Sequence, residues 1–298
     1  MKTKFWPDDS IEFNTVAVLG DFDGVHSAHR MLIEKAVSRA KENNLKSLVY
    51  TFEKSIKKDF NLISNENKKK IFEEMGVDIL VFQKVSEDFF NTSPEDFVRK
   101  TVVEKLKASY VIVGENYTFG KKGAGKSEDL KRLLEENSVE CEIVKLVEMD
   151  EKVLSSTQIR EFLREGNVKD ANKFLGRRYS ISGVVEYGNR IGRTIGFPTV
   201  NIRPEGNELL PKFGVYAVYA NIDGEMKKGV ANVGIKPTVG GKIPLVETNV
   251  FGMEGEFYGE RIEVEFVDFI RPEQKFPDIE TLKEQIEKDK LKAKIILE

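Results

Sequence analysis

The feature that most constrains the fold is the alternation of short apolar runs with longer amphipathic segments up to about residue 150. The apolar runs predict strands at 16–19, 48–51, 79–82, 110–113 and 142–147, and the segments between them predict helices at 28–43, 65–75, 94–107 and 127–137. Strands joined by such helices form right-handed crossovers and a parallel sheet. This part of the chain therefore predicts a doubly wound α/β domain that binds ligands at the C-terminal ends of its strands.

The pattern changes in the last part of the chain. Two short helices are expected at 156–165 and 168–175, and from Arg178 onward short strands follow one another. Residues 261–266 alternate polar and apolar side chains, as a half-buried antiparallel strand does. A strand at 214–222 runs into Asp223-Gly224, a hairpin turn. We expect an antiparallel barrel or sandwich with a closing helix from about Asp278, and domains at 1–177 and 178–298.

Composition excludes several classes of protein. The 298 residues suit about two domains. A net charge of −3 argues against a nucleic-acid partner. No run approaches the roughly 20 apolar residues of a membrane span. The lone cysteine, Cys141, cannot form an internal disulfide, and the N-terminus lacks a signal-peptide pattern, so we expect a cytoplasmic protein.

The only two histidines, His26 and His29, lie where the first strand meets the first helix, in the stretch GDFDGVHSAH at 20–29. Imidazoles three residues apart on a first helical turn face the same way. A helix N-terminus favours an anion, so this junction predicts a phosphate-binding site. The alternatives are a metal clip that recruits Asp21 and Asp23, or two incidental surface histidines. A zinc site needs about four ligands, and no cysteine or third histidine is near.

A second polar segment, VLSSTQIR at 153–160, runs into a predicted helix. Its hydroxyls, Ser155, Ser156 and Thr157, and the cation of Arg160 are suited to phosphate oxygens. Alone, the segment is more typical of a helix N-cap, Ser156 or Thr157, followed by a solvated arginine. Together with the histidines it predicts the second half of a triphosphate clamp.

Residues 120–127, GKKGAGKS, match the P-loop pattern letter for letter. A P-loop leaves its strand almost directly at the first glycine, whereas here residues 115–119 intervene. We therefore favour a basic glycine loop that approaches ATP with Lys121, Lys122 and Lys126 over a working P-loop.

The second half carries its own polar motif, at 188–201, which ends in Thr199 and Asn201. A hydroxyl and an amide oxygen two residues apart on an extended segment suit Mg²⁺ that also binds phosphates. The alternative is a structural turn stiffened by Pro198. Downstream, Glu247 stands among apolar residues, where a carboxylate can serve as a general base or be a plain exposed charge.

Taken together, these segments resemble the bifunctional bacterial riboflavin kinase/FMN adenylyltransferase (FAD synthetase) family. Residues 20–29 are similar to its G-x-F-D-G-x-H-x-G-H signature, and 153–160 to its I-S-S-T-x-I-R element. Residues 93–98 and 114–120 resemble connecting segments, so the P-loop match overlaps the family's phenylalanine–glycine loop. Residues 196–201, 234–238, 258–259 and 271–276 resemble riboflavin kinase segments.

The resemblance implies a nucleotidyltransferase-like first domain, a β-barrel kinase domain, and two ATP-dependent reactions that take riboflavin to FMN and FMN to FAD. It implies catalytic roles for Glu247, His26, His29 and Arg160. Nucleotide contacts are implied for Gly20, Phe22, Asp23, Gly24, Asn116, Ser155, Ser156, Thr157, Gly192, Gly196 and Pro198. Flavin contacts are implied for Phe119, Arg271, Glu273 and Phe276, and Mg²⁺ contacts for Thr199 and Asn201. We expect a monomer or a weak homo-oligomer.

Three departures from the family pattern stand out. Ala28 replaces the glycine between the histidines, residues 53–58 replace a proline–histidine–proline stretch, and Asn249 stands where many members have histidine. A riboflavin kinase with a weak adenylyltransferase domain is the nearest alternative. A non-catalytic flavin-binding protein and a P-loop NTPase are the others.

Overall fold

The computed structural model describes residues 1–6, 11–53, 60–150, 152–186, 196–204, 207–238, 241–253 and 257–298. The chain divides into two compact units. The first comprises Met1–Asn61 and Asn65–Ser155, and the second Leu62–Ser64 and Ser156–Glu298. The domain boundary expected between residues 177 and 178 stays a prediction.

The first unit is built on a six-stranded parallel sheet with the order β1-β4-β3-β2-β5-β8. Its strands are β1 (Lys2–Trp6), β2 (Thr15–Leu19), β3 (Lys46–Phe52), β4 (Ile79–Gln83), β5 (Ala108–Gly114) and β8 (Glu140–Val144). The predicted doubly wound sheet is thus confirmed. Strand β1, which was not predicted from the sequence, pairs in parallel with β4 at one edge of the sheet.

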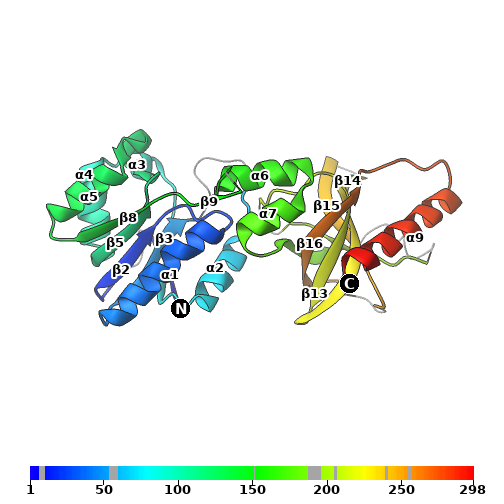
Figure 1. Cartoon of the computed structure of the whole chain (residues 1–298), viewed down its shortest axis with the longest axis horizontal. Helices are drawn as coiled ribbons and strands as arrows, with labels where there is room; N and C mark the ends of the chain where they lie inside the picture. Colours follow the sequence, from blue (N-terminus) through cyan, green and yellow to red (C-terminus); the bar gives the residue numbers. More distant parts are fainter. Residues whose placement is uncertain are drawn as a thin grey trace. The chain divides into compact units, whose positions relative to one another are not determined.

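Helices connect these strands along the chain, as Figure 1 shows. They are α1 (Ser27–Glu42), α2 (Asn65–Glu74), α3 (Glu87–Asn91), α4 (Pro94–Asp96), the π-helix η1 (Phe97–Val103) and α5 (Ser127–Glu135). The helix expected at 94–107 begins as predicted, because the Ser93 hydroxyl caps it by accepting from the Asp96 backbone N–H at 3.1 Å. It then widens into η1, where the Glu104 N–H bonds the Arg99 carbonyl five residues back.

The sheet is buried on both faces. Every residue of β2 is buried, as expected for a parallel strand covered on both sides. Ala17 and Leu19 join a core with Phe97 and Leu130, from η1 and α5. Because β2 lies between β3 and β5, the strand order reverses there. The C-terminal ends of β2 and β5 therefore form the crevice in which such folds bind ligands.

The second unit is a closed antiparallel barrel with the order β11-β12-β15-β14-β13-β16. Its elements are α6 (Ser156–Glu165), α7 (Val168–Leu175), β11 (Tyr179–Glu186), β12 (Val200–Ile202), β13 (Gly214–Ile222), β14 (Glu225–Thr238), β15 (Gly241–Val250), β16 (Arg261–Arg271) and α9 (Ile279–Ile296). Asp223 and Gly224 form the predicted hairpin with φ of 52° and 84°. Asp278 begins α9 as its N-cap.

Helices cover parts of this barrel (Figure 1). α7 packs on β11 and β16, and α9, drawn in red, packs on β13, β14 and β16. Asn172 of α7 ties the helix to the barrel, because its side-chain amide donates to the Phe266 carbonyl at 2.8 Å. The barrel and its terminal helix, both predicted, are confirmed.

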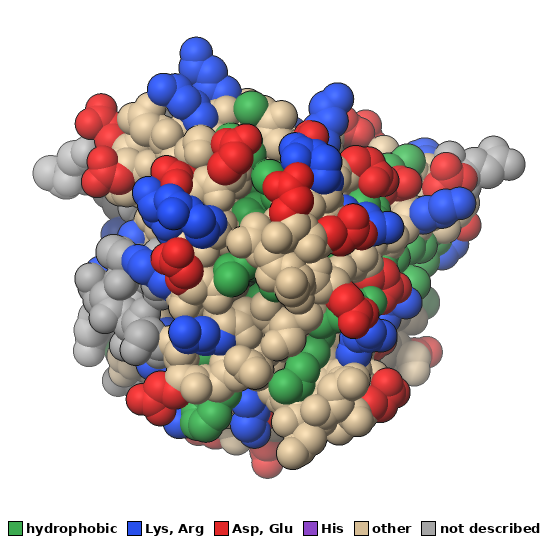
Figure 2. Space-filling view, turned by 90° about the vertical axis from the view of Figure 1, so that its left-hand side faces the viewer, with side chains coloured by type: hydrophobic (Ala, Val, Ile, Leu, Met, Phe, Trp, Pro, Cys, Tyr) green, Lys and Arg blue, Asp and Glu red, His purple; other side chains and the backbone are tan. Residues whose placement is uncertain are grey.

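Surface charge is mixed on the face drawn in Figure 2, where Lys and Arg side chains alternate with Asp and Glu. No large patch of one sign stands out on that face. Within the described ranges, none of the helices has the length and apolarity needed to cross a bilayer.

Candidate active sites

The loop between β2 and α1 has an unusual backbone. Phe22 and Val25 adopt left-handed conformations with φ of 47° and 43°, and Gly24 lies between them at 84°. Gly20 makes room for the loop, since a Cβ there would lie 2.8 Å from the Phe22 ring. Non-glycine residues hold such angles only where their surroundings impose them, and such residues cluster at functional sites.

The two histidines come together at the end of this loop. His26 is the N-cap of α1, and its Nδ1 accepts from the His29 backbone N–H at 3.4 Å. The imidazole rings stack with centroids 3.5 Å apart and an angle of 19° between their planes. The edge-on ring of Phe22 lies 5.1 Å from that of His29. Because Nδ1 of His26 is an acceptor, its neutral ring carries the proton on Nε2.

Burial favours the uncharged form of His29. Desolvation first, then the charges of His26 and Lys68, lower the pKa of His29 well below 6.5. Its Nδ1 is buried without a hydrogen-bond partner. No cluster of three or more metal-ligating side chains occurs in the part of the chain that the structure describes, so the metal-clip alternative gains no support.

Ala28 has an ordinary helical backbone, because it lies inside α1 and is not among the residues with positive φ. The glycine of the family signature is therefore not needed for the conformation of the chain here. Residues 54–59, which cover most of the second departure, lie outside the described residues.

The sequence analysis missed two residues beside this loop, Lys68 of α2 and Thr51 of β3. Both donate to the Asp21 carbonyl, at 3.2 Å from the Lys68 ammonium and 2.7 Å from the Thr51 hydroxyl. Lys68 is only 4% exposed. It is the first of three consecutive lysines, a pattern typical of a solvated helix surface, so no local signal marks it.

Aromatic rings gather around Phe97 of η1. The ring of Phe119, predicted to contact flavin, is buried, stacks on Tyr117 at 6.0 Å and lies 5.5 Å from Phe97. Tyr50 lies 6.0 Å from Phe97, and its hydroxyl donates to Gln83 at 2.6 Å. Burial raises the pKa of Tyr50, which keeps its hydroxyl protonated. Apart from Phe119, the sequence analysis missed these rings.

The P-loop look-alike forms a hairpin. Residues 120–124 connect β6 (Thr118–Phe119) to β7 (Gly125–Lys126), two short antiparallel strands, and include the 3₁₀ turn η2 (Lys121–Gly123). Gly125 packs against the Phe119 ring, which a Cβ would approach to 2.6 Å. A P-loop instead joins a sheet strand directly to a helix. Asn116, a predicted nucleotide contact, is exposed in the turn after β5.

The segment at 153–160 contributes to both units. It follows the small hairpin of β9 (Glu148–Met149) and β10 (Lys152–Val153). Ser155 ends the first unit, and Ser156 and Thr157 begin α6 in the second. Arg160 is 3% exposed and donates to the Ser156 carbonyl at 3.0 Å, so the alternative of a solvated arginine is wrong. Its approach to the histidines stays a prediction.

A row of polar side chains crosses the barrel. Asn201 of β12 lies directly opposite Glu247 of β15, which in turn lies opposite Asn232 of β14. All three are half-buried, whereas Val246 and Thr248 on either side of Glu247 are buried. The structure thus brings Asn201 and Glu247 together as cross-strand neighbours. Asn232 was missed, because strand register cannot be read from the sequence alone.

The segment before β12 is held by Asn249. Its amide donates to the Pro198 carbonyl at 2.7 Å. Thr199, two residues before Asn201, is exposed. Gly196 has a φ of 87° that suits glycine. Gly192 lies in 187–195, outside the described residues. The hydroxyl and amide oxygens of Thr199 and Asn201 are hard ligands that fit Mg²⁺.

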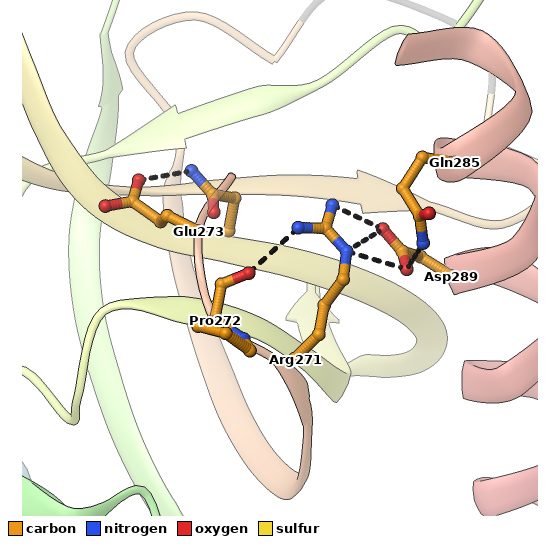
Figure 3. Close-up of polar contacts among 6 residues, drawn as sticks. Arg271, Pro272, Glu273, Gln285 and Asp289 are labelled. Atoms are coloured by element: carbon orange, nitrogen blue, oxygen red, sulfur yellow. Dashed lines mark hydrogen bonds and ion pairs between the residues drawn. The ribbon is translucent and has the colours of Figure 1, made fainter. Parts of the chain in front are cut away.

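Figure 3 shows that Arg271 has a protein partner. Its Nε and Nη2 donate to the Asp289 carboxylate at 3.0 and 2.7 Å, and its Nη1 donates to the Pro272 carbonyl at 2.9 Å. Gln285 also donates to Asp289, at 2.9 Å. The donors of Arg271 are thus occupied by α9 and by its own loop, and a direct flavin contact stays a prediction.

The two other residues predicted to contact flavin lie near by. Asn232 donates to the exposed Glu273 at 3.4 Å. This hydrogen bond connects the loop after β16 to the row of polar side chains formed by Asn201, Glu247 and Asn232. The Phe276 ring lies 5.7 Å from the Arg271 guanidinium.

A doubly wound unit with a histidine pair at its switch point, followed by a barrel with a carboxylate beside an amide, defines a class: two-domain transferases that use nucleotides. Family comparisons make this specific. The FAD synthetase family matches residues 8–158, and the riboflavin kinase family matches residues 175–297. The chain belongs to the bifunctional riboflavin kinase/FMN adenylyltransferase family.

Relatives match along nearly their whole length. The bifunctional riboflavin kinase/FMN adenylyltransferase of Listeria monocytogenes is 36% identical over 95% of this chain and 92% of the relative. The protein of the same name from Bacillus subtilis is 38% identical over 94% and 91%. A solved structure described as a macrolide-efflux protein from Streptococcus pneumoniae superimposes with a TM-score of 0.87 at 31% identity, over 96% of each chain.

Proposed function

We propose that this chain phosphorylates riboflavin to FMN in the barrel unit and adenylylates FMN to FAD at the sheet of the first unit. The observation that carries the kinase step is the placement of Glu247 directly opposite Asn201. The stacked pair of His26 and His29 at the sheet's switch point carries the adenylyl step.

In the kinase step, Glu247 accepts the proton of the riboflavin 5′-hydroxyl. The oxygen attacks the γ-phosphorus of ATP, the bond to the β-phosphate oxygen breaks, and ADP leaves. Thr199 and Asn201 would hold Mg²⁺, which would supply neutralisation of the phosphate charge. Asn249 orients Thr199 through the Pro198 carbonyl. Gly196 and Pro198 belong to the same segment, and both are assigned to binding of the nucleotide.

In the adenylyl step, an FMN phosphate oxygen attacks the α-phosphorus of ATP, the bond to the β-phosphate breaks, and pyrophosphate leaves. A neutral imidazole donates its N–H to the oxygens that gain charge in the transition state, and this role is assigned to the stacked pair of His26 and His29. Arg160 and the hydroxyls of Ser155, Ser156 and Thr157 bind phosphate oxygens. The loop between β2 and α1 is shaped by Gly20, Phe22, Asp23 and Gly24. Asn116 is assigned to contact the nucleotide.

The stacked rings after β5 suit the flavin of FMN. Tyr117 is half-buried and stacks on the buried Phe119 with 12° between their planes, so its outer face is assigned to the planar ring system. In the barrel unit, Glu273 and Phe276 are assigned to riboflavin, with Arg271 holding their loop against Asp289.

Incubating the full chain with riboflavin, ATP and Mg²⁺ and separating the flavins tests both steps. We expect FMN first and then FAD with pyrophosphate. Glu247→Gln should stop FMN formation yet leave the conversion of added FMN to FAD, and His29→Ala should do the reverse. FMN that never proceeds to FAD would leave a kinase alone, and flavin binding without ADP or pyrophosphate would contradict both steps.

A further inference from the structure

Lys68 is a buried cation that the proposed reactions do not yet use. On α2 its neighbours Lys69 and Lys70 are exposed, whereas Lys68 is 4% exposed. Lysine is almost never buried unless its ammonium is paired, so its partners explain its place. Its hydrogen-bond acceptor is the backbone carbonyl of Asp21, and the carboxylates of Asp21 and Asp23 attract it.

The hydrogen bond from Lys68 is accepted by the peptide between Asp21 and Phe22, at the start of the loop between β2 and α1. Lys68 and the Thr51 hydroxyl donate to the same Asp21 carbonyl, from α2 and from β3. The next residue, Phe22, has a φ of 47°. A carbonyl held by two donors fixes the orientation of the peptide that leads into this left-handed residue, which is how such conformations persist.

α2 supports the loop a second time, through Phe72. Its ring lies 6.2 Å from that of Phe22, nearly perpendicular to it. Lys68 and Phe72 are four residues apart and so share one face of α2. The ring of Phe22 in turn lies 5.1 Å from that of His29. A continuous set of contacts therefore runs from Lys68 through the loop to the histidine pair.

Lys68 also acts on the pair through its charge. The ionisable groups that act on His29 are His26, the N-cap of α1, and Lys68 on α2. Those that act on Lys68 are Asp21 and Asp23 in the loop. The positive charge of Lys68 lowers the pKa of His29, in addition to the larger effect of burial.

We propose that Lys68 is a positioning residue of the adenylyl-transfer site, which fixes the loop at 21–25 and, through it, the ring of His29. The inference rests on the proposed adenylyl transfer. A second consequence is that its charge adds to burial in favouring the uncharged form of His29 when the anionic substrates are absent.

The test compares three substitutions in the full chain. Lys68→Met removes the charge and the hydrogen bond, Lys68→Gln removes the charge but keeps an N–H donor, and Lys69→Met is the matched exposed control on the same helix. We expect kcat for FMN adenylylation to fall roughly 10- to 100-fold in Lys68→Met with KM for FMN little changed, because misplacement of a catalytic group costs about this much. Lys68→Gln should retain more of kcat, and Lys69→Met should retain all of it.

Histidine NMR gives a readout that does not depend on activity. The chain holds two histidines, so its spectrum contains the ring signals of two imidazoles to titrate, assigned with His29→Gln. Loss of the Lys68 charge should raise the pKa of His29 in both Lys68 variants, and the acid limb of the adenylylation rate should move to higher pH by the same amount. Lys69→Met should leave both unchanged.

The outcomes separate the two proposals. A wild-type chain that makes FMN but no FAD contradicts the adenylyl step, and the NMR titration then tests the action of Lys68 on His29. A wild-type chain that makes FAD at a rate Lys68→Met leaves unchanged overturns the inference on Lys68 alone. If Lys68→Met does not fold, as judged by circular dichroism, the decision passes to Lys68→Gln, for which an unchanged His29 titration and an unchanged kcat would overturn it.

Discussion

Removing one partner of the ion pair between Arg271 and Asp289 should strongly destabilise the contact between α9 and the barrel. Its side chains are 16% and 4% exposed, and three donor–acceptor distances of 2.7–3.0 Å connect them. Asp289→Ala would leave a largely buried guanidinium without its carboxylate. Removing one partner of such a pair costs about 3–5 kcal/mol.

That cost is measurable by urea unfolding, followed by far-UV circular dichroism and by riboflavin kinase activity. With a urea slope of about 2 kcal/mol per M, the transition of the second unit should move down by roughly 1.5–2.5 M. The control is the ion pair between the exposed Glu287 and the half-buried Lys290 on the same helix, and Glu287→Ala should cost less than about 1 kcal/mol.

The double variant Arg271→Met/Asp289→Leu separates charge from packing. Because it removes both charges, it should recover most of the stability that Asp289→Ala loses. A loss below about 1 kcal/mol in Asp289→Ala, or a double variant as unstable as the single one, would show that an unpaired buried guanidinium is not what destabilises this contact.

Two further predictions concern the first unit. Lys126 is exposed on a hairpin, so Lys126→Ala should leave FMN formation unchanged. We also expect no ATP hydrolysis by the wild-type chain when flavin is absent. Flavin-independent hydrolysis that Lys126→Ala abolishes would support the P-loop interpretation. The folded-state pKa of His29 lies below its unfolded value of about 6.5, so the unfolded state binds the proton first as the pH falls. The free energy of unfolding of this unit should therefore decrease below about pH 6.5, by at most about 1.4 kcal/mol per pH unit, and His29→Gln should flatten that slope in urea titrations between pH 7.5 and 5.5.

The sequence predicted the elements whose signals are local. Ser93 and Pro94 mark a helix start, the all-apolar run of β2 marks a buried strand, and Asp223-Gly224 marks a hairpin, and each is present. The edge strand β1 was missed because its alternation of lysine and threonine with few apolar residues does not resemble the central strands. The π-helical η1 was missed because its widened bonding leaves the hydrophobic spacing almost helical.

Site residues, too, were predictable only where the signal is local in the sequence. The histidine pair and the hydroxyl segment stand out in the sequence, since unusual residues are concentrated there. Lys68 and Asn232 do not, because their importance comes from contacts with residues 47 and 41 positions away. The burial of Arg160 likewise depends on tertiary packing that no local pattern records.

The three-residue strand β12 limits how the kinase half of this family can change in evolution. Asn201 sits at its centre, opposite Glu186 on one side and Glu247 on the other. Strand side chains alternate between faces, so deleting or inserting a single residue here would present Val200 or Ile202 to Glu247 instead. Homologues can therefore exchange amino acids in β12, but gaps in an alignment should fall in the connections on either side of it.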